Sequence, residues 1–229
     1  MKTRQIPLTP AVPSDWPYRL LPRDQRGQWV TEDGPFRQYA DGIYLGVEKG
    51  DHVFWRDKIK GKRRCELVRQ GFFNECRWGY TTTHSLVMDF PLGLTYNPAF
   101  LIINQTHTTD LDPGFWIWNV QLNSDRMLAI ELVTNSHKRY RLPLSSDSRQ
   151  HLVIETYWTT DGDGYVQMKV NDELTPKIFG QTLPSKSHRA EYKIGPYDGR
   201  GYTDEFGVLY RSLRITEQLS VPRWKLYTP

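Results

Sequence analysis

Residues 151–170, HLVIETYWTTDGDGYVQMKV, decide the fold class. Two strand-like runs, 151–159 and 165–170, flank Asp161-Gly162-Asp163-Gly164, and an Asp-Gly turn between two such runs is a strong β-hairpin signal. The rest of the chain repeats this pattern of short runs separated by turn residues, without a sustained helical period. Many short strands at such spacing predict an all-β protein, either a β-sandwich or a jelly roll.

The predicted strands begin after a proline-rich N-terminal segment. Residues 1–25 hold five prolines and are expected to form an extended arm, and residues 26–229 are expected to form a single domain. Residues 143–149 have room for one helical turn at most. The predicted strands span residues 27–31, 42–48, 52–56, 64–69, 84–90, 101–107, 115–120, 127–134, 138–142, 151–159, 165–170, 190–197 and 205–215.

The charge of the chain is mildly basic, with a formal net charge of +4. Basic residues crowd the stretch from Arg56 to Arg69, which predicts either a solvated loop or a surface that attracts an anionic polymer such as nucleic acid or acidic polysaccharide. No apolar run approaches membrane-spanning length. The N-terminus has no signal-peptide core, so we expect either a protein not exported by that route or a mature form with an added start Met.

The two cysteines, Cys65 and Cys76, do not form a CxxC pair, which argues against a zinc site. A hairpin centred on residues 70–71 would place them opposite each other and permit a disulfide. The same register would set Glu66 against Glu75, which is unfavourable. The disulfide is therefore left open, with two buried thiols as the alternative.

Three short polar motifs on separate strand-like runs contain the candidate site residues. Polar members of each motif are spaced at multiples of two, so they share one face of a strand. Brought together on one sheet, they would place a cation, an amide, a base and a phenol in one groove. The pairs that share a face are Arg64 with Glu66, Gln105 with His107, and Lys193 with Tyr197.

These motifs, in this order, resemble the signature of β-jelly-roll polysaccharide lyases. Alginate lyases of that fold carry R-x-E-L-R, Q-x-H and Y-F-K-x-G-x-Y-x-Q strands, and the third motif is also similar to the heparin lyase I and glucuronan lyase group. Val68 stands where the first motif has its second Arg, and Gly199 stands where the third has its closing Gln. The resemblance implies a concanavalin-like β-jelly roll of two antiparallel sheets and a uronate-polymer lyase.

The chemistry of β-elimination fits the same residues. The substrate carboxylate must be neutralised, a base must take the C5 proton, and an acid must protonate the leaving O4. Arg64 and Gln105 suit neutralisation, His107 suits the base or the neutraliser, and Tyr197 suits the acid. In the families that the chain resembles, the matching tyrosine can serve as both base and acid, so His107 and Tyr197 both stay candidates for the base. Lys193, a cation on the same face, would help the phenol to ionise.

Further substrate contacts are expected from residues around this group. Glu66 is predicted to position Arg64. Arg69 is a further candidate for substrate binding, with its side chain on the opposite face of the strand from Arg64. His84 is an additional candidate, with ordinary packing as the alternative. Trp116 and Trp118 alternate on one strand and are candidates for stacking on sugar rings, again with core packing as the alternative.

Other functions fit the sequence less well. It has no carboxylate run typical of a glycoside hydrolase, no G-x-S-x-G elbow, no Walker loop and no H-E-x-x-H. A non-catalytic lectin-like carbohydrate-binding module of the same fold is the main alternative. We expect an anionic polysaccharide as partner, no nucleic acid, no membrane, no cofactor or metal, a monomer, and extracellular action as a mature secreted or phage-associated protein. Alginate, glucuronan, a heparin-like glycosaminoglycan and a bacterial capsule remain possible substrates.

Overall fold

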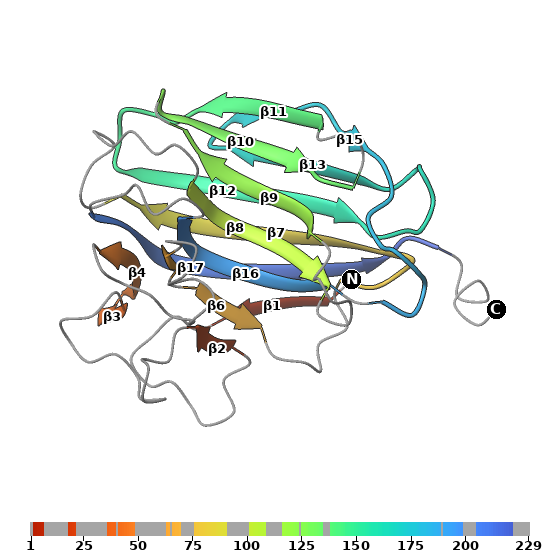
Figure 1. Ribbon diagram of the computed structural model, residues 1–229, viewed down its shortest axis with the longest axis horizontal. Coiled ribbons are helices and arrows are strands. Elements are labelled where there is room, and N and C mark those ends of the chain that lie inside the picture. Colours follow the sequence, from red (N-terminus) through yellow and green to blue (C-terminus); the bar gives the residue numbers. More distant parts are fainter. Residues whose placement is uncertain are drawn as a thin grey trace.

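The computed structural model describes residues 2–6, 18–21, 36–39, 41–48, 63–64, 66–69, 76–90, 101–108, 116–123, 125–134, 138–188, 190–198 and 205–221 (Figure 1). These residues form strands and connecting turns without a helix, which confirms the predicted all-β class. The strands are β1 (Lys2–Ile6), β2 (Tyr18–Leu21), β3 (Phe36–Tyr39), β4 (Gly42–Glu48), β5 (Arg63–Arg64), β6 (Glu66–Arg69), β7 (Tyr80–Asp89), β8 (Leu101–Thr108), β9 (Trp116–Leu122), β10 (Met127–Leu132), β11 (Lys138–Pro143), β12 (Arg149–Tyr157), β13 (Tyr165–Val170), β14 (Glu173–Leu174), β15 (Ile178–Phe179), β16 (Ala190–Asp198) and β17 (Glu205–Leu219).

The strands pair into two antiparallel sheets, as the jelly-roll prediction requires. The nine-stranded sheet has the order β14-β13-β12-β7-β17-β4-β3, with β1 on β17 and β15 on β13. The eight-stranded sheet has the order β11-β10-β9-β8-β16-β6-β2, with β5 on β16. Figure 1 shows β8, β9 and β10 of the second sheet layered over β7 and β12 of the first.

The hairpin predicted from residues 151–170 is present. Strands β12 and β13 pair antiparallel, with Tyr157 opposite Tyr165 at the turn end and Leu152 opposite Val170 at the far end. Side chains of β12 alternate between buried and more exposed positions, as expected for a strand with one face on a core. The predicted strands at 27–31 and 52–56 lie outside the described residues.

Strands β1 and β2 both belong to the segment expected as an extended arm. Strand β1 pairs with β17 in the nine-stranded sheet, and β2 pairs with β6 in the eight-stranded sheet. The arm therefore contributes a strand to each sheet. The domain boundary at residue 25 remains a prediction.

The hydrophobic core lies between the sheets. Large side chains such as Trp158, Met88 and Leu101 are fully buried there. Cys76 belongs to this core cluster, whereas Cys65 lies outside the described residues, so their pairing remains open. The described part of the chain contains no helix with the length and hydropathy needed to cross a membrane.

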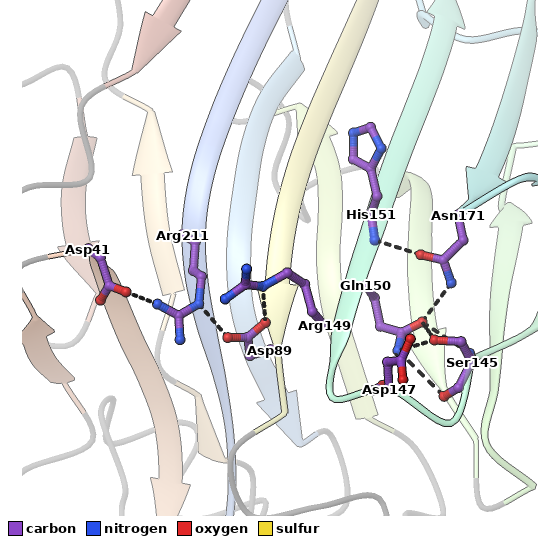
Figure 2. A network of polar contacts seen from close by, with 9 residues as sticks. All are labelled: Asp41, Asp89, Ser145, Asp147, Arg149, Gln150, His151, Asn171 and Arg211. Carbon is purple, nitrogen blue, oxygen red and sulfur yellow. Dashed lines mark hydrogen bonds and ion pairs between the residues drawn. The ribbon is translucent and has the colours of Figure 1, made fainter.

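A charged network at the end of β7 joins several strands of the nine-stranded sheet (Figure 2). Asp89 accepts a hydrogen bond from Nε of Arg149 at 3.2 Å and another from Nε of Arg211, whose guanidinium also pairs with Asp41. Burial acts to raise the pKa of the Asp89 carboxyl, but the hydrogen bonds and charges of Arg211 and Arg149 outweigh it and hold the pKa below its ordinary value. Ionised Asp89 therefore stabilises the fold.

We expect Asp89→Asn to lower the free energy of unfolding at neutral pH by about 1.5–3 kcal/mol, because charge-assisted hydrogen bonds are lost. A carboxyl with a lowered pKa in the folded state stabilises above its unfolded pKa of about 3.9 and loses this contribution as the pH falls through the folded pKa. The difference between wild type and variant should therefore shrink below about pH 4. Urea unfolding across a pH series measures it.

The matched control is Asp172→Asn, which removes a fully exposed carboxylate 3.9 Å from Lys169. Its loss should leave the free energy of unfolding close to that of wild type, because exposed ion pairs contribute little to stability. An Asp89→Asn curve that runs parallel to wild type through the acid range would contradict the assignment.

Candidate active site

A row of polar residues crosses the eight-stranded sheet at one level. Directly opposed residues of antiparallel strands lie on the same side of the sheet. The neighbouring pair Tyr192 and Thr106 occupies the other side, where Tyr192 joins the core. We call the side opposite the core the polar face. The polar row runs in register from Lys193 on β16 through Gln105 on β8, Asn119 on β9 and Glu131 on β10 to Arg139 on β11.

Tyr197 and His107 lie near this row on the same face. His107 follows Gln105 by two residues on β8 and is paired with Trp116 on β9. The Trp116 ring meets the Tyr197 ring edge-on, with centroids 6.4 Å apart. Trp116 of β9 is therefore the register partner of His107 and contacts Tyr197, and the two strands predicted to carry the base and the acid are neighbours.

The hydrogen bond of His107 indicates its tautomer. Nδ1 of His107 lies 3.1 Å from the backbone carbonyl oxygen of Thr108. A carbonyl only accepts, so Nδ1 carries the proton in this contact. In the neutral imidazole Nε2 is then the acceptor, which is the form needed for a general base.

Most of the candidate side chains on the polar face are almost fully buried. Tyr197 is 2% exposed, Gln105 3% and Lys193 6%, whereas Trp116 is 37% exposed. Charges act more strongly on one another where water is excluded. The face therefore combines a shielded cation, an amide and a phenol beside one accessible aromatic ring.

Three register shifts shape the strands that carry the group, one of them between Thr106 and His107 where β8 pairs with β9. The other two lie between Ile102 and Asn104 where β8 pairs with β9, and between Ile194 and Tyr197 where β16 pairs with β8. Gly195 adopts a φ of 121°, a conformation that side-chain-bearing residues rarely take. Pro196 lies within the register shift between Ile194 and Tyr197, and proline in a strand is found mainly at edges and bulges.

One tyrosine of the opposite sheet bridges the bulges at Ile103 and Gly195. The hydroxyl of Tyr210, on β17, donates to the carbonyl oxygen of Ile103 at 2.8 Å and accepts from the backbone N–H of Gly195 at 3.1 Å. Backbone groups displaced from a ladder by a bulge need such partners when buried. Tyr210 therefore ties β8 to β16 next to Tyr197 and is a positioning residue.

We expect Tyr210→Phe to cost about 1–3 kcal/mol of stability, because it leaves buried backbone groups without this partner. It should also lower turnover at temperatures far below unfolding, since the strand carrying Tyr197 loses its anchor. Thermal unfolding and kcat measure the two effects.

Tyr192→Phe is the matched control. It removes a buried hydroxyl on β16 that accepts a 2.9 Å hydrogen bond from the side-chain Nδ2 of Asn104, rather than one that bonds the backbone of both strands as the Tyr210 hydroxyl does. Equal losses of kcat in the two variants would show that Tyr210 acts only through stability.

His84 and Trp118 need a correction, because both are fully buried in the core. The His84 ring stacks on Tyr192 with centroids 3.9 Å apart, and Trp118 packs near both rings. Thr106 pairs with Trp118 while His107 pairs with Trp116, so a register shift at Ile117 turns the two tryptophans to opposite faces. Only Trp116 of these candidates reaches the polar face.

The first motif is placed by its backbone alone. Arg64 lies opposite Tyr197 in the register, and Val68 lies opposite Lys193. Glu66 lies opposite Leu21 and Arg69 opposite Tyr18. The side chains of these residues lie outside the described part of the chain, so the roles assigned to Arg64, Glu66 and Arg69 remain predictions.

Several polar-face residues were not predicted from the sequence. Asn119 and Gln121 alternate with apolar residues in β9, a pattern that marks a polar strand face. Glu131 and Arg139 give no such signal and join the row only through register. Among the described residues no group of three or more His, Cys, Asp or Glu side chains is arranged to hold a metal ion.

The fold is similar to that of solved polysaccharide lyases. An endo-β-1,4-glucuronan lyase from the fungus Trichoderma reesei superposes with a TM-score of 0.61 at 11% identity, covering 82% of this chain and 89% of that one. An alginate lyase from Pseudomonas aeruginosa gives 0.57 at 19%, covering 83% and 88%. An alginate lyase of polysaccharide lyase family 7 gives 0.60 at 14%, covering 88% and 94%.

No protein-family model and no curated protein matches the chain. At these identities the likeness concerns the backbone. The chain has the β-jelly-roll fold of polysaccharide lyases, as its three motifs led us to expect.

Proposed function

We propose that the protein is a polysaccharide lyase that cleaves a uronic-acid-containing anionic polysaccharide by β-elimination. The observation that carries the proposal is that His107, Gln105, Lys193 and Tyr197 share one face of neighbouring strands in a lyase-like sheet. The amide and the cation suit a carboxylate, and the imidazole and the phenol suit the two proton transfers.

The proposed reaction begins at the uronate carboxylate. Gln105 donates to it, together with Arg64, whose backbone lies opposite Tyr197. This neutralisation acidifies the C5 proton and stabilises the enolate-like intermediate. Nε2 of His107 takes the C5 proton, since Nδ1 is committed to the Thr108 carbonyl.

Bond cleavage follows from the enolate-like intermediate. The electron pair forms the C4–C5 double bond as the C4–O4 bond breaks, and the Tyr197 hydroxyl donates its proton to O4. His107 then carries one extra proton and Tyr197 lacks one, so transfer through solvent restores both. Lys193, on the same strand as Tyr197, stabilises the phenolate in between.

A panel of acidic polysaccharides tests this function. Glucuronan and alginate come first, because structurally similar enzymes are named for them. A heparin-like glycosaminoglycan and bacterial capsules follow. The readout is the ultraviolet absorbance of the unsaturated uronate end, and binding is measured in parallel. Binding to a polymer without any rise in absorbance across the panel would favour the lectin-like alternative.

A further inference from the structure

The polar row continues past the proposed catalytic group to a carboxylate. Glu131 on β10 is partly exposed, and its Oε2 accepts from Gln121 Nε2 at 2.8 Å and from Asn119 Nδ2 at 3.4 Å. Gln121 Nε2 also donates to Asn119 Oδ1 at 2.7 Å. Both amides are almost fully buried, so the carboxylate is held by fixed neighbours.

The position of Glu131 relative to the catalytic group follows from the register. Gln105 is opposite Asn119, and Asn119 is opposite Glu131, so two strand spacings separate Gln105 from Glu131. Neighbouring strands lie about 4.8 Å apart, which places Glu131 about 10 Å from the site proposed for the uronate carboxylate. A chain lying along the row would bring a neighbouring sugar there.

Two arginines lie on β11, at the edge of the sheet where the polar row ends. Arg139 is opposite Glu131, and Arg141 follows two residues later on the same side of β11. Arg139 donates a hydrogen bond to Asn123 Oδ1 at 2.6 Å, and Arg141 donates one to Asp125 Oδ2 at 2.9 Å. Partial desolvation lowers the pKa of the Arg139 guanidinium and the like charge of Arg141 lowers it further, whereas the charges of Glu131 and Asp125 act in the opposite direction.

We propose that Glu131 forms a sugar-binding subsite that accepts a neutral sugar and disfavours a uronate, so that the preferred polymer carries a neutral sugar on the β10 side of the uronate to be cleaved. The inference rests on the proposed function, because it takes the polymer to lie along the polar row. A carboxylate is an acceptor only and suits sugar hydroxyls, which donate. A uronate carboxylate at the same place would face a like charge held by buried amides.

Glu131→Gln tests the subsite, because it keeps the shape and one acceptor oxygen and removes the charge. The probes are glucuronan, a homopolymer of glucuronate, and hyaluronan, in which glucuronate alternates with a neutral N-acetylated sugar. Binding of the full chain is measured by calorimetry at low and at moderate salt in the Tyr197→Phe background, so that cleavage does not consume the polymer.

We expect Glu131→Gln to tighten glucuronan binding about tenfold at low salt, since about 1.4 kcal/mol of relieved repulsion corresponds to a factor of ten. Hyaluronan binding should stay the same or weaken, because a hydroxyl acceptor is lost. Glu173→Gln is the control, because it removes an equal charge from an exposed position on β14 of the other sheet.

The outcomes separate this proposal from the lyase assignment. Unchanged glucuronan binding, or equal gains for Glu131→Gln and Glu173→Gln, would overturn the subsite. Absence of binding to either polymer would overturn the subsite, whereas the lyase assignment is decided by the polysaccharide panel. A third outcome is that Glu131→Gln selectively tightens glucuronan binding while the wild-type protein cleaves no polymer on the panel. That outcome would support the subsite and refute the lyase.

Discussion

Replacing Tyr197 with phenylalanine is expected to lower kcat by about 10²- to 10⁴-fold, the range for loss of a positioned proton donor. Polymer binding should change little, because the ring and its edge contact with Trp116 remain. The measurement is kcat from the ultraviolet assay alongside binding by calorimetry, with the substrate identified by the polysaccharide panel.

Tyr140→Phe provides the matched control for Tyr197. It removes a tyrosine hydroxyl from an exposed ring on β11 of the same sheet and should leave kcat unchanged. Wild-type turnover in the Tyr197→Phe variant would refute the assignment of Tyr197 as the acid.

Removing the imidazole of His107 is expected to slow turnover by a similar factor, about 10²- to 10⁴-fold, because the proton at C5 loses its acceptor. Gln105→Ala should cost about 10²- to 10³-fold in kcat, the range for loss of a donor to developing negative charge. Both effects should exceed the change in KM, since these contacts strengthen as the carboxylate gains charge.

His151→Ala serves as the histidine control. His151 is exposed on β12 of the other sheet, where its Nε2 lies 2.9 Å from Ser85 Oγ. Its loss should leave kcat and KM near wild type. A rise in KM with unchanged kcat in the His107 and Gln105 variants would show that these residues bind the polymer without taking part in the chemistry.

Local sequence patterns predicted the strands and the faces of the site motifs. The Asp-Gly turn between two apolar-polar runs placed the β12–β13 hairpin, because turn chemistry and period-two alternation are local properties. The spacing of Gln105 with His107, and of Lys193 with Tyr197, predicted which of them share a face. Period two also failed locally, at Trp116 and Trp118, because the inserted Ile117 reverses the alternation.

The role of each buried residue depended on contacts between sheets. Histidine is a residue type suited to a general base. His84, however, lies on β7 of the opposite sheet, where its ring stacks on Tyr192 in the core. Tyr210 is about a hundred residues from Ile103 in sequence and meets it only across the sandwich. Such long-range contacts carry no periodic signal in the sequence.

The amino-acid sequence was therefore sufficient for the all-β class, the jelly-roll resemblance and the residue types of the proposed chemistry, because alternation, turns and short motifs are encoded locally. Tertiary structure alone decided which strands became neighbours. Pairing of β16 with β8 set Lys193 opposite Gln105, and pairing of β9 with β10 brought Glu131 into the same row. Strand order and register follow from packing of the whole sandwich, which no single segment specifies.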